Sequence, residues 1–404
     1  MSYGLFGLPL ALLALPIYVY VPQFYATHFA MSLALIGSTL LIARVLDAFF
    51  DPMFGMWIDK QRGTKGYSRV ITVAIPLMIV GFVALFHPPQ NISAQPFFWF
   101  LGSLIMVYLG FSLASIAYQS WGASLDQSKS HRTSITSARE TCGLIGVIIA
   151  AALPAFTDIS ALSFVFVLTL LISAYFLFCL APRPELSNGA GFALSGLIRP
   201  LRNSCFRWLI AVFTLNGIAA AIPATLFLFF TNDRLLLQQY AGLFLIVYFL
   251  AAALFMPLWV VIAKIHGEKK SWMIAMVLAT FTFIWAYFLG AGESTGYAVI
   301  CILSGAALGA DLALPPALLA AVISQAGHIG KYSGTYFGIW NWATKLNLAL
   351  AAGIALPLLQ WMGYQSGSHD EVGLHGLAVG YALLPCALKL CALILLWRAP
   401  LNHV

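Results

Sequence analysis

Twelve long apolar segments, joined by short polar connections, decide what this chain of 404 residues can fold into. Each segment is long enough for a tilted helix that crosses a lipid bilayer, which takes roughly 20 apolar residues. Only 8% of the residues are charged, whereas a soluble domain carries roughly 25%. The sequence therefore predicts an all-α membrane protein with twelve transmembrane helices. The segments cover residues 4–26, 30–58, 69–87, 96–124, 134–157, 160–181, 207–230, 238–263, 271–290, 295–324, 333–362 and 374–398.

A longer polar connection, residues 182–206, follows the sixth segment. Its Pro, Gly, Ser and Arg residues are typical of a linker, so we predict one six-helix bundle over residues 1–181 and a second over 207–404. Transporters that rock two halves about a solute near the bilayer midplane have this plan. Almost all lysines and arginines of the connections fall on the linker side. The positive-inside rule then predicts a protein of the cytoplasmic membrane with both termini in the cytoplasm.

The second apolar segment carries three charged residues, Arg44, Asp47 and Asp51. An ionised group in hydrocarbon costs at least about 2.5 kcal/mol, so such groups persist where they face protein or water. Their i, i+3, i+7 spacing puts all three on one helix face. Two carboxylates about 6 Å apart repel each other unless a cation or a shared proton lies between them. The pair therefore predicts a coupling site for H⁺ or Na⁺; the alternative is a structural ion pair with Arg44 that only fixes helix packing.

Two more ionisable residues lie deep in apolar segments, Asp311 in the tenth and Lys345 in the eleventh. Ionisable groups within spans are functional candidates by default, and we expect Asp311 to contact the solute. For Lys345 we expect Asp47, Asp51 or Asp311 as a partner that changes when a cation binds. A permanent ion pair is the alternative.

Other features of the apolar segments concern the lining of a solute cavity. Arg139 stands beside Glu140 in the fifth segment, and neighbours on a helix point to different sides. We therefore expect the two side chains to point apart, with Glu140 meeting loop charges near the cytoplasm. Pro315 and Pro316 should bend or break the tenth helix. Aromatic and amide groups near the midplane could stack on a sugar or bind its hydroxyl groups, although such residues also pack in helix cores. The candidates are Tyr18, Tyr20, Tyr118, Gln119, Trp121, Asn216, Trp340, Asn341 and Trp342.

Motifs around the second segment indicate a family. The loop "GMWIDKQRG", with Gly55, Asp59 and Lys60, resembles the cytoplasmic gating loop of the major facilitator superfamily. The stretches "ARVLDAFFDPMFGMWIDK", "SARE" and "YSGTYFGIWNWATKLNLAL" are similar to the glycoside–pentoside–hexuronide:cation symporters, the melibiose permease group. This resemblance covers nearly the whole chain. It implies the major facilitator fold, in which two six-helix bundles face each other.

The resemblance also implies roles for single residues. In the family the helix-2 aspartates bind the coupling cation with help from a helix-4 hydroxyl, and these positions are Asp47, Asp51 and Ser112 here. The family's functional arginine in span 5 and lysine in span 11 match Arg139 and Lys345. The resemblance therefore implies that Arg139 lines the solute cavity.

The chain departs from the family at the sugar contacts. The acidic residue of span 1 falls at Pro9, its span-4 partner at Ser115 and the stacking tryptophan at Gln119. An asparagine of the cation site falls at Phe50. Melibiose is therefore not the expected solute, and the choice between Na⁺ and H⁺ stays open. Ser115 and Gln119 remain candidates for solute contact.

These observations predict a secondary active transporter, a symporter that moves a sugar, glycoside or related small polar solute with H⁺ or Na⁺ by alternating access. Because the sequence holds no nucleotide-binding or catalytic motif, we expect no enzyme, no cofactor and no metal beyond Na⁺ at the carboxylate pair. The net charge of +7 has no basic run beside aromatic residues, so no nucleic-acid partner is expected. We expect a monomer in membrane lipid. The alternatives are a carrier of a lysolipid or other amphipathic or charged solute, and a non-transporting sensor or assembly factor on the same fold.

Overall fold

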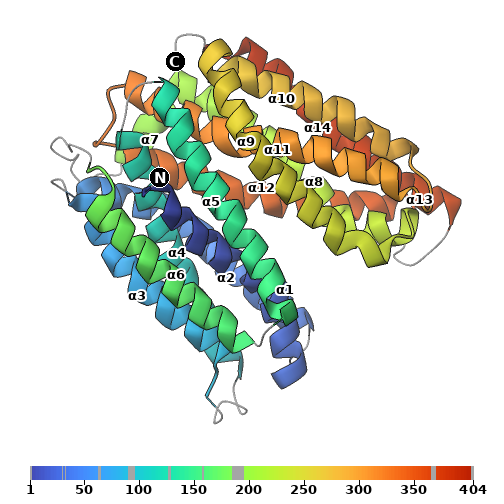
Figure 1. Cartoon of the computed structure of the whole chain (residues 1–404), viewed down its shortest axis with the longest axis horizontal. Coiled ribbons are helices and arrows are strands. Elements are labelled where there is room, and N and C mark those ends of the chain that lie inside the picture. The colour runs from blue at the N-terminus through green and yellow to red at the C-terminus, as the bar shows by residue number, and fades with distance from the viewer. Residues whose placement is uncertain are drawn as a thin grey trace. The chain divides into compact units, whose positions relative to one another are not determined.

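The computed structural model describes residues 2–29, 31, 33–61, 65–89, 96–125, 129–156, 159–183, 195–364 and 370–401. These ranges consist of helices and turns, without a strand among them (Figure 1). In the first half of the chain the helices are α1 (Gly7–Phe29), α2 (Leu33–Lys60), α3 (Gly66–Phe86), α4 (Pro96–Leu125), α5 (Lys129–Phe156), α6 (Ile159–Leu180) and α7 (Ser195–Arg202). In the second half they are α8 (Ser204–Phe229), α9 (Ala241–His266), α10 (Glu268–Phe283), α11 (Ser294–Gln325), α12 (Ser333–Trp361), α13 (Glu371–Ala378) and α14 (Leu384–Arg398).

Each predicted apolar segment is occupied by a helix, or by a helix continued through a short 3₁₀ or π turn, with ends within about five residues of those expected. Hydropathy sets these elements because a chain in lipid must satisfy its backbone polar groups internally, which a helix does. By length and composition, eight helices in the described ranges qualify as membrane spans. The prediction of an all-α membrane protein is confirmed.

Two expectations need comment. α11 is continuous from Ser294 to Gln325 with Pro315 and Pro316 inside it, so the expected break is absent. Prolines are tolerated within membrane helices because neighbouring groups satisfy the carbonyls they leave unbonded. Part of the expected linker, residues 195–202, is the short helix α7. Residues 184–194 of the linker lie outside the described residues.

The helices gather into two compact units. Unit 1 consists of Met1–Pro200 and Ile323–Trp342, and unit 2 of Leu201–Val322 and Ala343–Val404. The end of α11 and the first part of α12 therefore pack with α1–α6. The six-helix bundles with bounds at 181 and 207 stay a prediction.

Within unit 1, α1 packs along α5 and α3 along α4. Glycines permit the close approach of α1 and α5: a Cβ at Gly7 would lie 2.5 Å from the backbone oxygen of Arg139, and one at Gly146 would lie 2.2 Å from that of Leu8. Small residues at such crossings increase van der Waals contact, which drives helix association in lipid.

Within unit 2, two π turns meet in an aromatic core. Phe230 belongs to the turn Phe230–Arg234 that ends α8, and Tyr381 to the turn Val379–Leu383 between α13 and α14. Their rings stack at 4.0 Å between centroids with an interplanar angle of 6°. The hydroxyl group of Tyr381 lies 2.6 Å from that of Tyr297, so the buried phenols satisfy each other.

Candidate functional site

The predicted coupling carboxylates lie on the buried face of α2. Phe49, on another side of the helix, is 68% exposed, whereas Asp47 is 4% and Asp51 0% exposed. Ser112 of α4, itself 1% exposed, donates its hydroxyl to Asp47 Oδ1 at 2.6 Å, the length of a charge-assisted O–H···O⁻ bond. The structure therefore brings the predicted helix-4 hydroxyl to a helix-2 carboxylate. Binding of a cation there remains a prediction.

Glycines place the first part of α12 directly against this face of α2. A Cβ at Gly338 would lie 2.6 Å from the backbone oxygen of Asp51, and one at Gly55 would lie 2.2 Å from that of Gly334. No side chain fits at either crossing without a shift of the backbone. Gly55, which the sequence predicted as part of the gating loop, thus has a structural reason to be glycine.

Asp59 of the same motif caps the beginning of α12. Its Oδ1 accepts the backbone N–H of Gly334 at 2.6 Å, and its Oδ2 accepts the backbone N–H and the hydroxyl of Thr335 at 2.7 and 2.6 Å. The N-terminus of a helix attracts negative charge because its first N–H groups lack partners within the helix. Asp59 is 6% exposed, while the adjacent Lys60 is exposed. A gating role for Gly55, Asp59 and Lys60 stays a prediction.

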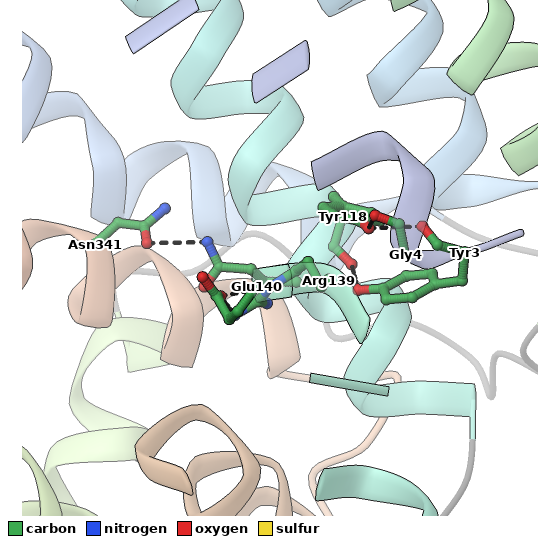
Figure 2. A network of polar contacts seen from close by, with 7 residues as sticks. Tyr3, Gly4, Tyr118, Arg139, Glu140 and Asn341 are labelled. Carbon is green, nitrogen blue, oxygen red and sulfur yellow. Dashed lines mark hydrogen bonds and ion pairs between the residues drawn. The ribbon is translucent and has the colours of Figure 1, made fainter. Parts of the chain in front are cut away.

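Figure 2 shows a polar network at the beginning of the chain and on α4 and α5. Tyr3 donates to the backbone oxygen of Tyr118 at 2.8 Å, and Tyr118 donates to that of Tyr3 at 2.6 Å. Arg139 Nε donates to Glu140 Oε1 at 2.9 Å. The expectation that the two side chains point to different sides of the helix is therefore wrong. Both side chains are long enough to curl toward each other although they leave the helix in different directions.

Two amides predicted as solute contacts bind each other within unit 1. Gln119 of α4 donates from Nε2 to Oδ1 of Asn341 in α12 at 3.2 Å (Figure 2). Both side chains are partly buried. The pair thus offers amide donors and acceptors on two helices that come from distant parts of the sequence.

Asp311 is the centre of a polar cluster within unit 2. Its Oδ2 accepts from Lys389 Nζ of α14 at 2.7 Å, in an ion pair whose side chains are each 11% exposed. Its Oδ1 accepts from Trp272 Nε1 of α10 at 2.7 Å and from Asn216 Nδ2 of α8 at 3.2 Å. No local sequence pattern pointed to Trp272 as a partner of this carboxylate.

The remaining site candidates are placed as follows. Ser115 is 5% exposed and Trp342 40% exposed, and Arg44 and Lys345 are partly buried. The side chain of Tyr18 lies outside the described residues. Asp311 and Lys345 belong to unit 2, and the other candidates belong to unit 1.

His328 stands in the turn between α11 and α12 within unit 1. Its Nδ1 lies 2.9 Å from the hydroxyl group of Tyr336, with which it shares a hydrogen bond. Partial burial, followed by the positive charges of Arg199 and Lys331, lowers the pKa of His328. The turn before α12 therefore favours a neutral imidazole.

The fold is that of the major facilitator superfamily. The chain superposes on the superfamily transporter FucP in the outward conformation with a TM-score of 0.71 and 15% identity, over 98% of this chain and 99% of FucP. A bacterial homologue of the iron transporter ferroportin in the outward-facing state gives a TM-score of 0.71 at 17% identity, over 97% and 98% of the two chains. These likenesses confirm the predicted fold.

The chain belongs to the family described as MFS/sugar transport protein, whose profile matches residues 2–403. It is 30% identical over 132 residues to the isoprimeverose transporter of Lactiplantibacillus pentosus, which is 32% of this chain and 27% of that protein. It is 32% identical over 97 residues to YagG of Escherichia coli (strain K12), described provisionally as a glycoside/cation symporter, which is 24% and 19% of the two chains. The aligned stretches thus span about a quarter of the relatives' length. Family membership confirms the resemblance.

Proposed function

We propose that this protein is a cation-coupled secondary active transporter, a symporter that moves a sugar or glycoside with H⁺ or Na⁺ by alternating access. The family description supports sugar transport. The relatives' descriptions as a transporter of isoprimeverose and a glycoside/cation symporter support the solute class and the coupling. We place the protein as a monomer in the cytoplasmic membrane. The one-sided distribution of Lys and Arg supports an orientation with both termini in the cytoplasm.

The contact between Asp47 and Ser112 carries the proposal. A carboxylate that is 4% exposed accepts a hydroxyl at 2.6 Å, and a second carboxylate, Asp51, follows one helical turn later with 0% exposed. Two buried negative charges so close are costly unless positive charge or a proton joins them, and Arg44 on the same helix carries only one positive charge. Oxygen ligands suit hard cations, and these three side chains supply them. Binding of the ion then lowers the net negative charge within the helix bundle. Because the cost of burying the carboxylates falls, ion binding and the conformation of the bundle are linked.

The pairing of two of the other ionisable candidates, Arg139 and Asp311, favours an uncharged solute. Arg139 is neutralised by Glu140 in unit 1, and Asp311 by Lys389 in unit 2. A charged solute would have to compete with these partners. The amide groups of Gln119 and Asn341 can instead exchange their mutual hydrogen bond for hydroxyl groups of a sugar. This arrangement favours a sugar or glycoside over a charged solute.

Uptake into proteoliposomes tests the proposal. The full-length protein is supplied with isoprimeverose, with simple sugars or with lysophosphatidylcholine, under an inward Na⁺ gradient or pH gradient. We expect sugar accumulation driven by one of the gradients and abolished in Asp47→Asn. If Na⁺ is the coupling ion, Ser112→Ala removes an oxygen ligand, and a loss of about 1.5 kcal/mol should raise the Na⁺ concentration for half-maximal uptake roughly tenfold. If H⁺ is the coupling ion, the lost hydrogen bond no longer stabilises the ionised carboxylate, so half-maximal uptake should need a lower proton concentration.

Ser103→Ala is the matched control, because Ser103 is also a buried serine of α4, at 6% exposed, and lies outside the site. It should transport like the wild type. Gradient-driven accumulation by Asp47→Asn at the wild-type level would contradict the coupling role. Uptake of lysophosphatidylcholine alone would favour a lipid carrier, and a folded protein with no flux of any solute would favour a sensor.

A further inference from the structure

A groove runs along the outer surface of unit 2, between α10 and α14. These helices pack side by side (Figure 1), and the groove encloses about 610 Å³. Most of its length is apolar, with Ile274, Val277 and Ile394 among the lining residues. These three side chains are 46%, 51% and 52% exposed. In a membrane protein such a surface faces lipid, so the groove is a concave strip of the hydrocarbon-facing surface.

One end of the groove is basic and aromatic. His266, at the last residue of α9, and Lys270, in the first turn of α10, line it together with Trp397 near the end of α14. All three side chains are exposed, Trp397 by 67%. The surface is thus amphipathic along its length, apolar where the acyl region of a bilayer lies and cationic at one end.

A buried lysine fixes the position of this basic end. Lys269 donates Nζ to the backbone oxygen atoms of Trp397 at 3.2 Å and Ala399 at 2.7 Å. The start of α10 is thereby tied to the end of α14, which holds Lys270 and Trp397 at the same mouth of the groove. The neighbouring Lys264 and Arg398 are exposed cations, and Glu268, the acidic residue of this end, is 3% exposed.

We propose that this groove binds an anionic phospholipid, with one acyl chain along α10 and α14 and the phosphate at Lys270 and His266. The complementarity of charge identifies the occupant. In the orientation proposed above the basic end lies at the cytoplasmic leaflet, whose anionic lipids attract basic residues at the surface. Trp397 fits the interface between headgroup and acyl chain, where indole rings collect. The proposal concerns lipid binding and stands apart from the solute and the coupling ion.

Quenching by brominated lipid tests the site directly. The full-length protein is reconstituted in phosphatidylcholine vesicles that contain increasing amounts of phosphatidylglycerol, with dibrominated acyl chains on one lipid or the other. The chain has 11 tryptophans, so the signal of Trp397 is the difference between wild type and Trp397→Phe. We expect Trp397 to be quenched by brominated phosphatidylglycerol at about one-fifth or less of the mole fraction needed with brominated phosphatidylcholine, and the preference to shrink in high salt.

Two variants separate a site from diffuse attraction. Lys270→Gln should reduce the preference about fivefold, the ratio that corresponds to about 1 kcal/mol for one lysine near an anionic surface. Lys65→Gln removes the same charge from an exposed lysine of unit 1 and should change nothing. Retained quenching by brominated phosphatidylcholine in Lys270→Gln shows that the groove is intact.

Three results would overturn the proposal. Equal quenching of wild-type Trp397 by both lipids would mean ordinary boundary lipid. Equal losses in Lys270→Gln and Lys65→Gln would mean attraction by the whole surface. Protection of Trp397 from both lipids would mean that protein, such as a second copy of this chain, covers the groove.

Discussion

Replacement of Asp59 by asparagine should loosen the beginning of α12 measurably. One carboxylate accepts the N–H of Gly334, and the N–H and hydroxyl of Thr335, at 2.6 to 2.7 Å. Hydrogen bonds to a charged group contribute about 1.5–3 kcal/mol each. Asparagine keeps one acceptor oxygen, so Asp59→Asn loses the charge and one or two of the three bonds. Because the amide oxygen of asparagine can still accept one or two of these buried bonds, we expect a loss of about 2–4 kcal/mol.

Hydrogen–deuterium exchange of the purified protein measures this loss where it occurs. At about 1.4 kcal/mol per factor of ten, the peptide that contains Gly334 and Thr335 should exchange roughly 30-fold faster or more in Asp59→Asn. The apparent melting temperature should fall as well. Asp370→Asn is the matched control, because Asp370 caps α13 through one backbone N–H, that of Gly373, at 3.3 Å. Its effect should be no more than about 0.5 kcal/mol, because asparagine caps a helix about as well as aspartate.

Exchange at the wild-type rate at Gly334 and Thr335 in a folded Asp59→Asn protein would show that this carboxylate does not stabilise the beginning of α12. A larger effect of Asp370→Asn would show that the number and length of the hydrogen bonds do not determine the stabilisation.

Three further predictions follow from single contacts. The pKa of His328 is lowered in the folded state. Its contribution to stability is therefore present above the usual pKa of about 6.5 and is lost as the pH falls through the folded value. His328→Gln should remove this decrease of the melting temperature at acidic pH. Gly338→Ala puts a Cβ 2.6 Å from a backbone oxygen and should cost about 1–3 kcal/mol in thermal unfolding, whereas Gly102→Ala, with nothing within 4 Å, should not destabilise. Asp311→Asn and Lys389→Met should each cost about 3 kcal/mol because they leave a buried charge alone, and the double variant should regain most of that loss in the same assay.

Hydropathy predicted the helices well because the bilayer imposes one requirement on every span. Each apolar segment of sufficient length became a helix, and the bounds differ by a few residues where amphipathic turns extend beyond the apolar run, as at Lys129–Phe156. The helix α7 was not predicted, because its eight residues are too short and too polar for this criterion. Local sequence also indicated the buried face of α2, since a period of 3.6 residues puts Asp47 and Asp51 together.

Contacts between residues far apart in the chain could not be predicted from the sequence. Asp59 binds Thr335, which lies 276 residues away, and no local pattern identifies that partner, although a Ser–Gly–Thr start of a helix is a signal for capping. Asp311 takes Lys389, Trp272 and Asn216 from three other helices. The pairing of Arg139 with Glu140 was missed for another reason. The Cα–Cβ bonds of adjacent helical residues do point apart, but both side chains are long enough to meet beyond them.

The continuity of α12 has a mechanical consequence. Thr335, which binds Asp59, and Lys345 lie on one unbroken helix from Ser333 to Trp361, and ten residues of helix make about 15 Å of stiff rod. A displacement of the first turn along the helix axis is therefore transmitted to the lysine. The buried acid that binds the first turn and the ammonium group ten residues further on are in this way joined by one continuous helix.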